Sequence, residues 1–171
     1  MIKVTNLVRR YGDLTAINDV SFEIKKGEIV GLLGHNGAGK TTIMKVLTGF
    51  LEQCSGEVKI KGLDISEDLI AIQAKIGYLP ENVPLYPEMT ILDYLEYVAD
   101  LRGISPEDLK AKIAKAVSRT NLESKALNKI ETLSKGFKQR VGVAQAILHE
   151  PEILILDEPT NGLDPQGIHQ I

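Results

Sequence analysis

The chain has 171 residues, of which 43% are hydrophobic and 25% charged, as is ordinary for one globular domain with a sizeable core. Its net charge of −3 and its pI near 5.7 argue against nucleic acid as an electrostatic partner, and we expect no nucleic-acid partner. The single cysteine, Cys54, excludes an internal disulfide, and no apolar run approaches the roughly 20 residues that cross a bilayer.

The first part of the chain carries alternating patterns that predict β-strands. Ile2 and Val4 open one such segment, which ends at the turn signal of residues 12–13. Residues 20–25 alternate again, so we expect a half-buried strand of an antiparallel piece. The segment GEIVGLL, residues 27–33, is short, apolar and rich in β-formers, and we expect a further strand there.

Residues 34–42 read GHNGAGKTT and fit the pattern Gly-x-x-x-x-Gly-Lys-Ser/Thr between an expected strand and an expected helix. Glycines let such a loop aim its N–H groups at phosphate oxygens, and the helix start adds a positive dipole end. Lys40 would reach the β- and γ-phosphates, and the hydroxyl of Thr41 would bind Mg²⁺. The alternative is a chance glycine turn with a surface lysine. The residues expected to bind the nucleotide are Gly34, His35, Asn36, Gly37, Ala38, Gly39, Lys40, Thr41 and Thr42.

Three further short strands are predicted, at residues 58–60, 76–79 and 153–156. The last of these reads ILIL and is apolar on both faces, which suits a buried strand of a parallel sheet.

Helical patterns lie between the second and third of these strands. Thr90 and Asp93 resemble a capping box, and the amphipathic helix that they open ends at Gly103. Ser105 before Pro106 marks the start of another helix with one apolar face. We therefore predict an α/β core formed by residues 1–84 and 150–171, with a helical subdomain at residues 85–149.

A second candidate site follows the apolar strand ILIL. Asp157 would be delivered to the edge of the sheet beside the phosphate loop, where a carboxylate can hold Mg²⁺ through water. Glu158 could orient a water molecule for attack on the γ-phosphorus, which makes it the candidate catalytic residue. The alternative is that both acids only cap the turn before Pro159.

A third candidate, at residues 133–148, combines a helix start with small residues. Ser134 stands where a helix N-cap is expected, with Gly136 beside it, and such a start can bind an anion. By itself this pattern indicates little, because most helices capped by serine contact no ligand.

Together these motifs resemble the ATP-binding subunits of ABC transporters over essentially the whole chain. GHNGAGKTT is similar to the family's Walker A motif, LSKGFKQR to a variant of its signature, ILILDEP to its Walker B motif and NGLD, residues 161–164, to its D-loop. Tyr11 matches the position where the family stacks an aromatic ring on adenine; the alternative is a tyrosine packed at a sheet edge. The resemblance implies the P-loop NTPase fold of the RecA-like type, with ATP and Mg²⁺ as cofactors.

Two departures from the common pattern bear on the branch of the family. Glu81 stands where most relatives carry the glutamine of the Q-loop, and it would add a full negative charge to the metal site; the alternative is a solvent-facing glutamate. Lys135 and Phe137 alter the signature, while Ser134 and Gly136 remain. Both departures resemble the branch that pairs with ABC-2-type membrane subunits, which are mostly exporters.

The resemblance also implies partners and a place in the cell. Two copies, identical or different, would dimerise head to tail with each ATP between one phosphate loop and the partner's signature helix. Transmembrane permease subunits would hold the protein at the inner face of the membrane, on the cytoplasmic side. Three alternatives stay open: an ABC ATPase that acts on ribosomes or DNA, a nucleotide-binding module without hydrolysis, and a small-molecule kinase.

The family's switch histidine would follow the D-loop, and neither His149 nor His169 matches that position. The strand that precedes the switch histidine lies between the Walker A and Walker B strands in this class of ATPase. We therefore expect a C-terminally incomplete domain that is poorly stable and hydrolyses ATP negligibly by itself.

Overall fold

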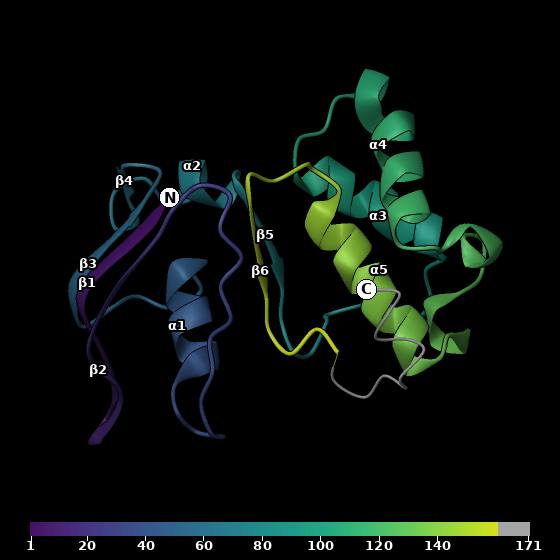
Figure 1. The fold of residues 1–171 in the computed structure, drawn as a ribbon. Coiled ribbons are helices and arrows are strands. Elements are labelled where there is room, and N and C mark those ends of the chain that lie inside the picture. The colour runs from purple at the N-terminus through teal and green to yellow at the C-terminus, as the bar shows by residue number, and fades with distance from the viewer. Residues whose placement is uncertain (161–171) are drawn as a thin grey trace. The chain divides into compact units, whose positions relative to one another are not determined.

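The computed structural model describes residues 1–160 and contains two compact units, Met1–Lys75 and a second unit that begins at Ile76 (Figure 1). The D-loop residues 161–164 and His169 lie outside the described residues. Within residues 1–160, no helix is long and apolar enough to cross a membrane.

The first unit is built on an antiparallel sheet of four strands in the order β2-β1-β3-β4. Ile2 and Val4 are buried on β1, as their alternation predicts, and a turn at residues 12–13 joins β1 to β2. The predicted strand at residues 20–25 is the second half of β2, where alternate side chains are half-buried. The bounds are β1 Ile2–Tyr11, β2 Leu14–Ile24, β3 Ser55–Ile60 and β4 Leu63–Asp64.

Two helices complete the first unit, α1 Lys40–Leu47 and α2 Leu69–Gln73. Figure 1 shows α1 beside the sheet, and its buried residues are Ile43, Val46 and Leu47. The helix predicted to follow the glycine loop is therefore confirmed.

The strand predicted over residues 27–33 is wrong. Residues 28–35 form no strand, Ile29 is fully exposed and Leu33 is 93% exposed. A strand is held by backbone hydrogen bonds to a neighbour, and no strand among residues 1–160 pairs with this segment. Its apolar sequence is not sufficient to make a strand without such a neighbour.

The second unit begins with two parallel strands, β5 Ile76–Leu79 and β6 Ile153–Leu156, which pair from Ile76 with Ile153 to Leu79 with Leu156. Both strands have the bounds that the sequence predicts. The helices between them along the chain are α3 Ile91–Leu101, α4 Pro106–Arg119 and α5 Lys135–Ile147, with the short 3₁₀ helices η1 Glu123–Lys125 and η2 Ile130–Thr132. A helical segment thus interrupts the strand pair as expected, while the domain boundaries at 84/85 and 149/150 stay a prediction.

Local capping explains where the helices start. Thr90 and Asp93 form the predicted capping box, in which each side chain accepts a hydrogen bond from the other residue's backbone N–H. Ser105 caps α4, with Pro106 as its first residue. Both predicted helix starts are therefore confirmed.

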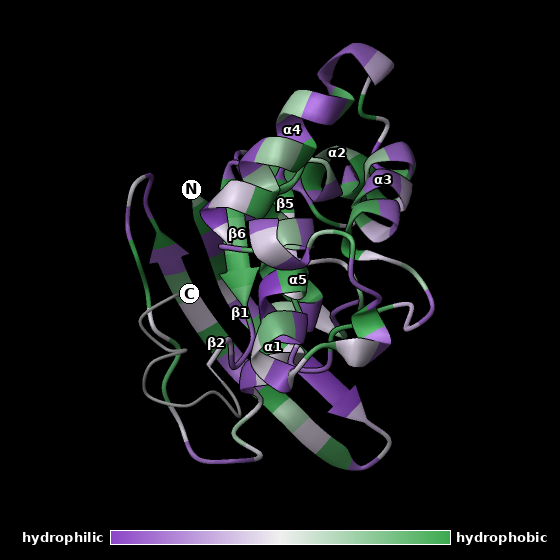
Figure 2. Cartoon of the chain, turned by 90° about the vertical axis from the view of Figure 1, so that its right-hand side faces the viewer, coloured by the Kyte–Doolittle hydropathy of each residue, from purple (hydrophilic) through white to green (hydrophobic). Residues whose placement is uncertain are grey.

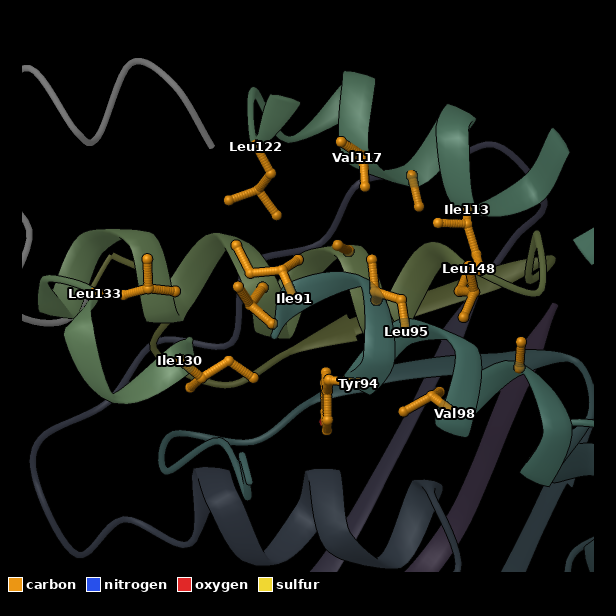
Figure 3. Packing of buried hydrophobic residues seen from close by; sticks show 14 residues of the cluster. Ile91, Tyr94, Leu95, Val98, Ile113, Val117, Leu122, Ile130, Leu133 and Leu148 are labelled. Atoms are coloured by element: carbon orange, nitrogen blue, oxygen red, sulfur yellow. The ribbon is translucent and has the colours of Figure 1, made fainter. Parts of the chain in front are cut away.

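The helices of the second unit share one hydrophobic core, and Figure 3 shows its side chains converging from α3, α4 and α5. Tyr94 belongs to this core, and Leu92 is partly buried and packs against it. The core residues are Ile91, Tyr94, Leu95, Val98, Ala99, Ile113, Ala116, Val117, Leu122, Ile130, Leu133, Val141, Ala144 and Leu148.

The prediction that ILIL is buried on both faces is wrong for β6. Figure 2 shows β6 in hydrophobic colour, yet Leu154 is 44% exposed and only Ile155 of this strand is buried. In the described residues β6 pairs with β5 alone and is an edge strand, so its apolar side chains are not covered on both faces.

Candidate functional site

The glycine loop that precedes α1 is an exposed backbone turn. Gly37 and Gly39 have φ of 82° and 86°, in the left-handed region that glycine adopts without strain. The N–H of Ala38 donates to the carbonyl of His35 at 3.1 Å, which closes the turn, while residues 34–38 stay exposed. The loop therefore presents backbone rather than side chains to a ligand.

The start of α1 carries the positive end of a helix dipole. The N–H of Ile43 donates to the carbonyl of Gly39 at 2.9 Å, which closes the first turn of the helix. No side chain caps this end at Gly39, and no acidic residue lies in the first turn. The positive end of the helix dipole is thus not neutralised by the helix's own residues.

Lys40 extends over the loop that precedes it. Its Nζ donates to the carbonyl oxygens of Gly34 at 2.8 Å and His35 at 3.2 Å. These contacts hold the ammonium group at the loop, and Thr41 and Thr42 follow it, half-buried, in the first turn of α1. A lysine in this place can pair with the charge of a phosphate group.

Packing against β2 fixes the end of the loop. A Cβ at Gly39 would lie 2.4 Å from the carbonyl oxygen of Ala16, so only glycine fits there. Ala16 follows the hairpin turn in which Tyr11 pairs with Leu14. Tyr11, the predicted adenine-stacking residue, is 43% exposed on this hairpin, so the first unit places the tyrosine on the strand pair that supports the phosphate loop.

In the second unit, the predicted metal residues lie where β5 and β6 end. Asp157 directly follows β6, is 2% exposed, and its N–H donates to the carbonyl of Leu79 at 2.9 Å. Because parallel strands end at the same edge of a sheet, Glu81 and Asp157 leave that edge together. Glu81 is exposed while Asp157 is buried, so the two carboxylates have different environments.

Tyr78 is a neighbour of Asp157 that sequence reasoning missed. Burial, followed by the negative charge of Asp157, raises the pKa of Tyr78 to about 12. The sequence does not predict this contact, because Tyr78 lies within an apolar strand and Asp157 comes close to it only when β6 pairs with β5.

Glu158, the predicted catalytic residue, has an unusual backbone. Its φ is 50°, which is left-handed and uncommon for residues other than glycine, and its side chain is exposed. Such conformations cost of order 1–3 kcal/mol and concentrate at functional sites. The turn after β6 therefore directs an exposed carboxylate out of the strand end next to the buried Asp157.

The donor set fits a magnesium ion that is shared with a nucleotide. Within residues 1–160 there is no group of three or more His, Cys, Asp or Glu side chains that could hold a metal by itself. Mg²⁺ commonly binds through one or two carboxylates together with substrate phosphates and water. Asp157, with Glu81 at the same edge of the second unit, agrees with that chemistry, and the Thr41 hydroxyl stays a predicted donor.

Ser134 caps α5 as predicted. Its Oγ accepts a hydrogen bond from the N–H of Phe137 at 3.4 Å, and the serine itself is exposed. Gly136 lies in the first turn, and the guanidinium of Arg140 lies 5.0 Å from the ring centroid of Phe137. The serine's local role is confirmed, whereas its phosphate contact stays a prediction.

Comparison with known proteins identifies one family. The family profile described as "ABC transporter" matches residues 17–161. Over the whole chain, the linearmycin resistance ATP-binding protein LnrL of Bacillus subtilis is 37% identical and the bacitracin transport ATP-binding protein BcrA of Enterococcus faecalis is 40% identical. The lantibiotic transport ATP-binding protein SrtF of Streptococcus pyogenes is also 40% identical, and the match covers 72% of its length.

Solved structures agree in fold. A structure titled as an ATP-binding subunit of an ABC transporter superposes with a TM-score of 0.87 at 33% identity, covering 99% of this chain and 70% of its own. A bacterial ABC transporter cassette solved as a dimer gives a TM-score of 0.90 at 29% identity, covering 100% and 79%. The chain spans about half the length of the linearmycin and bacitracin relatives, 55% and 54% respectively.

Proposed function

Because the chain belongs to the ABC transporter family of ATP-binding subunits, we propose that it binds and hydrolyses ATP to drive an exporter of the ABC-2 type. The observation that carries the proposal is the phosphate loop at the head of α1. The positive helix end and the ammonium group of Lys40 meet there on an exposed backbone loop.

Each part of the site has a separate task in this proposal. The loop and Lys40 bind the phosphates, and Tyr11 stacks on the adenine base. Asp157, Thr41 and Glu81 would hold Mg²⁺, which would offset negative charge on the phosphates. Catalysis then depends mainly on positioning and on charge stabilisation rather than on covalent chemistry.

Glu158 acts as the catalytic carboxylate in this mechanism. Exposed after β6, it accepts a hydrogen bond from a water molecule and orients that water toward the γ-phosphorus. The buried Asp157 beside it serves the metal instead, so two adjacent carboxylates take different roles because their environments differ.

The proposal extends to assembly. Two subunits dimerise with each ATP held between one phosphate loop and the helix start at Ser134 and Gly136 of the other. In this proposal residues 1–84 with 150–171 would form the ATP-binding core, and the helical subdomain 85–149 with the loop at Glu81 would transmit closure to permease subunits at the inner face of the membrane. Three relatives with names that refer to antibiotic resistance or transport support the exporter branch over action on ribosomes or DNA.

The test is ATP turnover and dimerisation of the full-length gene product, with Glu158→Gln beside it. We expect phosphate release to fall about 100-fold or more in the variant, as for loss of a general base, while ATP binding is retained. Size-exclusion chromatography with ATP and Mg²⁺ should show an ATP-bound dimer of Glu158→Gln.

Glu150→Gln is the matched control, because Glu150 is an exposed glutamate at the other end of β6, where it pairs with Lys115. This variant should keep its turnover within about twofold. Proteins that bind ATP but neither hydrolyse it nor dimerise would contradict the transport proposal and favour a nucleotide-binding module.

A further inference from the structure

The guanidinium group of Arg9 lies against the ring of Tyr11. The guanidinium carbon of Arg9 lies 5.0 Å from the centroid of the Tyr11 ring, within the range of a cation–π contact. The two residues are two apart on β1, a spacing that places side chains on the same face of a strand. Tyr11 is 43% exposed, so the ring stays accessible to a ligand although Arg9 lies against it.

Arg9 is held in place from the other side. Its Nη1 donates to the carbonyl of Glu52 at 2.9 Å, in the segment between α1 and β3. In the described part of the chain, the buried Nε–H of Arg9 has no acceptor. Hydrogen bonds therefore account for only part of the surroundings of this guanidinium group. The ring of Tyr11 supplies the remaining contact of the half-buried guanidinium group.

The segment that holds Arg9 is itself attached to β1. The N–H of Cys54 donates to the carbonyl of Val8 at 2.9 Å, and the N–H of Arg10 donates to the Sγ of Cys54 at 3.4 Å. With the contact between Arg9 and Glu52, three interactions tie the segment after α1 to the end of β1. The guanidinium group is thus positioned by backbone that does not depend on a ligand.

We propose that Arg9 is a positioning residue for the nucleotide base: it holds the Tyr11 ring from behind so that the opposite face stacks on the purine of the bound nucleotide. This inference rests on the proposed ATP-binding function and adds to it the residue that prepares the stacking surface.

Two physical effects give Arg9 this role. A cation behind an aromatic ring draws π-electron density toward itself, which lowers the repulsion between the ring's other face and an electron-rich purine. A ring that is already fixed also loses less side-chain freedom when the base binds. Both effects act on the base and neither acts on the phosphates, so the two ligand parts can be separated experimentally.

The experiment compares two probes, ATP and inorganic tripolyphosphate, by titration calorimetry on the full-length gene product. Tyr11→Leu should weaken ATP binding about tenfold, since base stacking on an aromatic ring is lost. Arg9→Met keeps the length of the side chain and should weaken ATP binding about three- to tenfold, with tripolyphosphate binding unchanged. Arg9→Lys should recover part of the loss, because it restores the charge without the planar group.

Arg10→Met is the matched control: Arg10 is the exposed neighbour on the same strand, and its replacement should change ATP binding less than twofold. In the double variant Arg9→Met with Tyr11→Leu, the loss should equal that of Tyr11→Leu alone, because Arg9 acts through the ring.

Three outcomes would overturn the inference: an equal loss for ATP and tripolyphosphate, no loss in Arg9→Met, or additive losses in the double variant. The proposed function fails separately. If neither the wild type nor any variant binds ATP or tripolyphosphate, the phosphate loop is not a nucleotide site. If the protein binds ATP and Tyr11→Leu has no effect, the nucleotide site stands, but Tyr11 does not stack the base and the role of Arg9 is contradicted.

Discussion

The phosphate loop and the strand edge at Asp157 are built in opposite ways. The loop at residues 34–39 is mostly exposed and consists of backbone turns, and only Lys40 adds a charged side chain. At the strand edge, a carboxylate is 2% exposed and is positioned by the pairing of two apolar strands. The first part offers main-chain groups to a ligand, and the second presents a side chain that the fold has removed from solvent.

The difference predicts which changes each part tolerates. A backbone site depends on φ angles and on the absence of Cβ atoms, so a single methyl group can destroy it. A buried carboxylate depends on charge, so an isosteric neutral residue should keep the structure and lose the function. Substitutions of each kind therefore separate the two dependences.

The largest expected effect is that of Gly39→Ala. The new Cβ would have to lie 2.4 Å from the carbonyl oxygen of Ala16 at a φ of 86°. We expect the free energy of unfolding of the full-length gene product to fall by about 3 kcal/mol, from left-handed strain together with overpacking. Urea unfolding in the absence of nucleotide measures this change in the free energy of unfolding.

Gly37→Ala is the control for this change. Gly37 has a similar φ of 82°, but a Cβ there meets nothing within 4 Å. The expected cost is about 1 kcal/mol, from backbone strain alone. Equal costs at the two glycines would show that contact with β2 does not fix the loop.

Lys40→Met tests the one charged side chain of the loop. Removing a charge-assisted contact with phosphate should weaken ATP binding about 30-fold, or roughly 2 kcal/mol. Lys45→Met, an exposed position in the last turn of the same helix, should change the affinity less than twofold. Comparable losses at both lysines would point to general electrostatic attraction instead of a defined site.

Asp157→Asn tests the desolvated carboxylate. Because asparagine keeps the shape and removes the charge, we expect the gain in ATP affinity on adding Mg²⁺ to shrink about tenfold. Binding of ATP in EDTA should be unchanged, and this condition controls for damage to the fold. A loss of the same size in EDTA would show that Asp157 supports the structure and not the metal.

Local signals account for the parts of the fold that the sequence predicts well. The capping box of Thr90 and Asp93, the cap at Ser134 and both strands β5 and β6 depend on a few adjacent residues. The glycine loop is similar, because its pattern and the helix that follows are contiguous. The fold does not test the roles of these residues in binding ATP and Mg²⁺, so those roles stay predictions.

The errors concern features that depend on distant neighbours. The apolar run at residues 27–33 forms no strand because no described strand pairs with it, and β6 is exposed at Leu154 because it is an edge. The burial of Tyr94 also depends on a distant neighbour, because its hydroxyl donates to the carbonyl of Pro84 at 3.4 Å. The left-handed backbone of Glu158 likewise has no signal in the sequence.

The smallest expected effect concerns the opposite end of β5 from Asp157. The carbonyl of Ile76 accepts a hydrogen bond from the Nε2 of His149 at 3.1 Å, so Nδ1 of the neutral ring carries no proton. Burial first, and then the positive charges of Arg102 and Lys112, lower the pKa of His149 below its usual 6.5, although the hydrogen bond to Ile76 opposes this. The folded state therefore favours the neutral ring.

The sign of the pH dependence follows from this shift. Below about pH 6.5 the unfolded chain takes up a proton at His149 that the folded chain resists, so the stability contribution is complete above pH 6.5 and declines as the pH falls toward the folded pKa. The loss should stay below about 1 kcal/mol, because a half-buried group is partly screened by solvent. His149→Gln keeps a donor for Ile76 and cannot titrate, so its unfolding free energy should decline less than that of the wild type between pH 6.5 and 5. The difference in unfolding free energy between the two proteins at pH 8 gives the cost of the substitution itself, and it is subtracted at each lower pH. Equal declines in the two proteins would show that the neutral form of His149 does not stabilise this end of the strand pair.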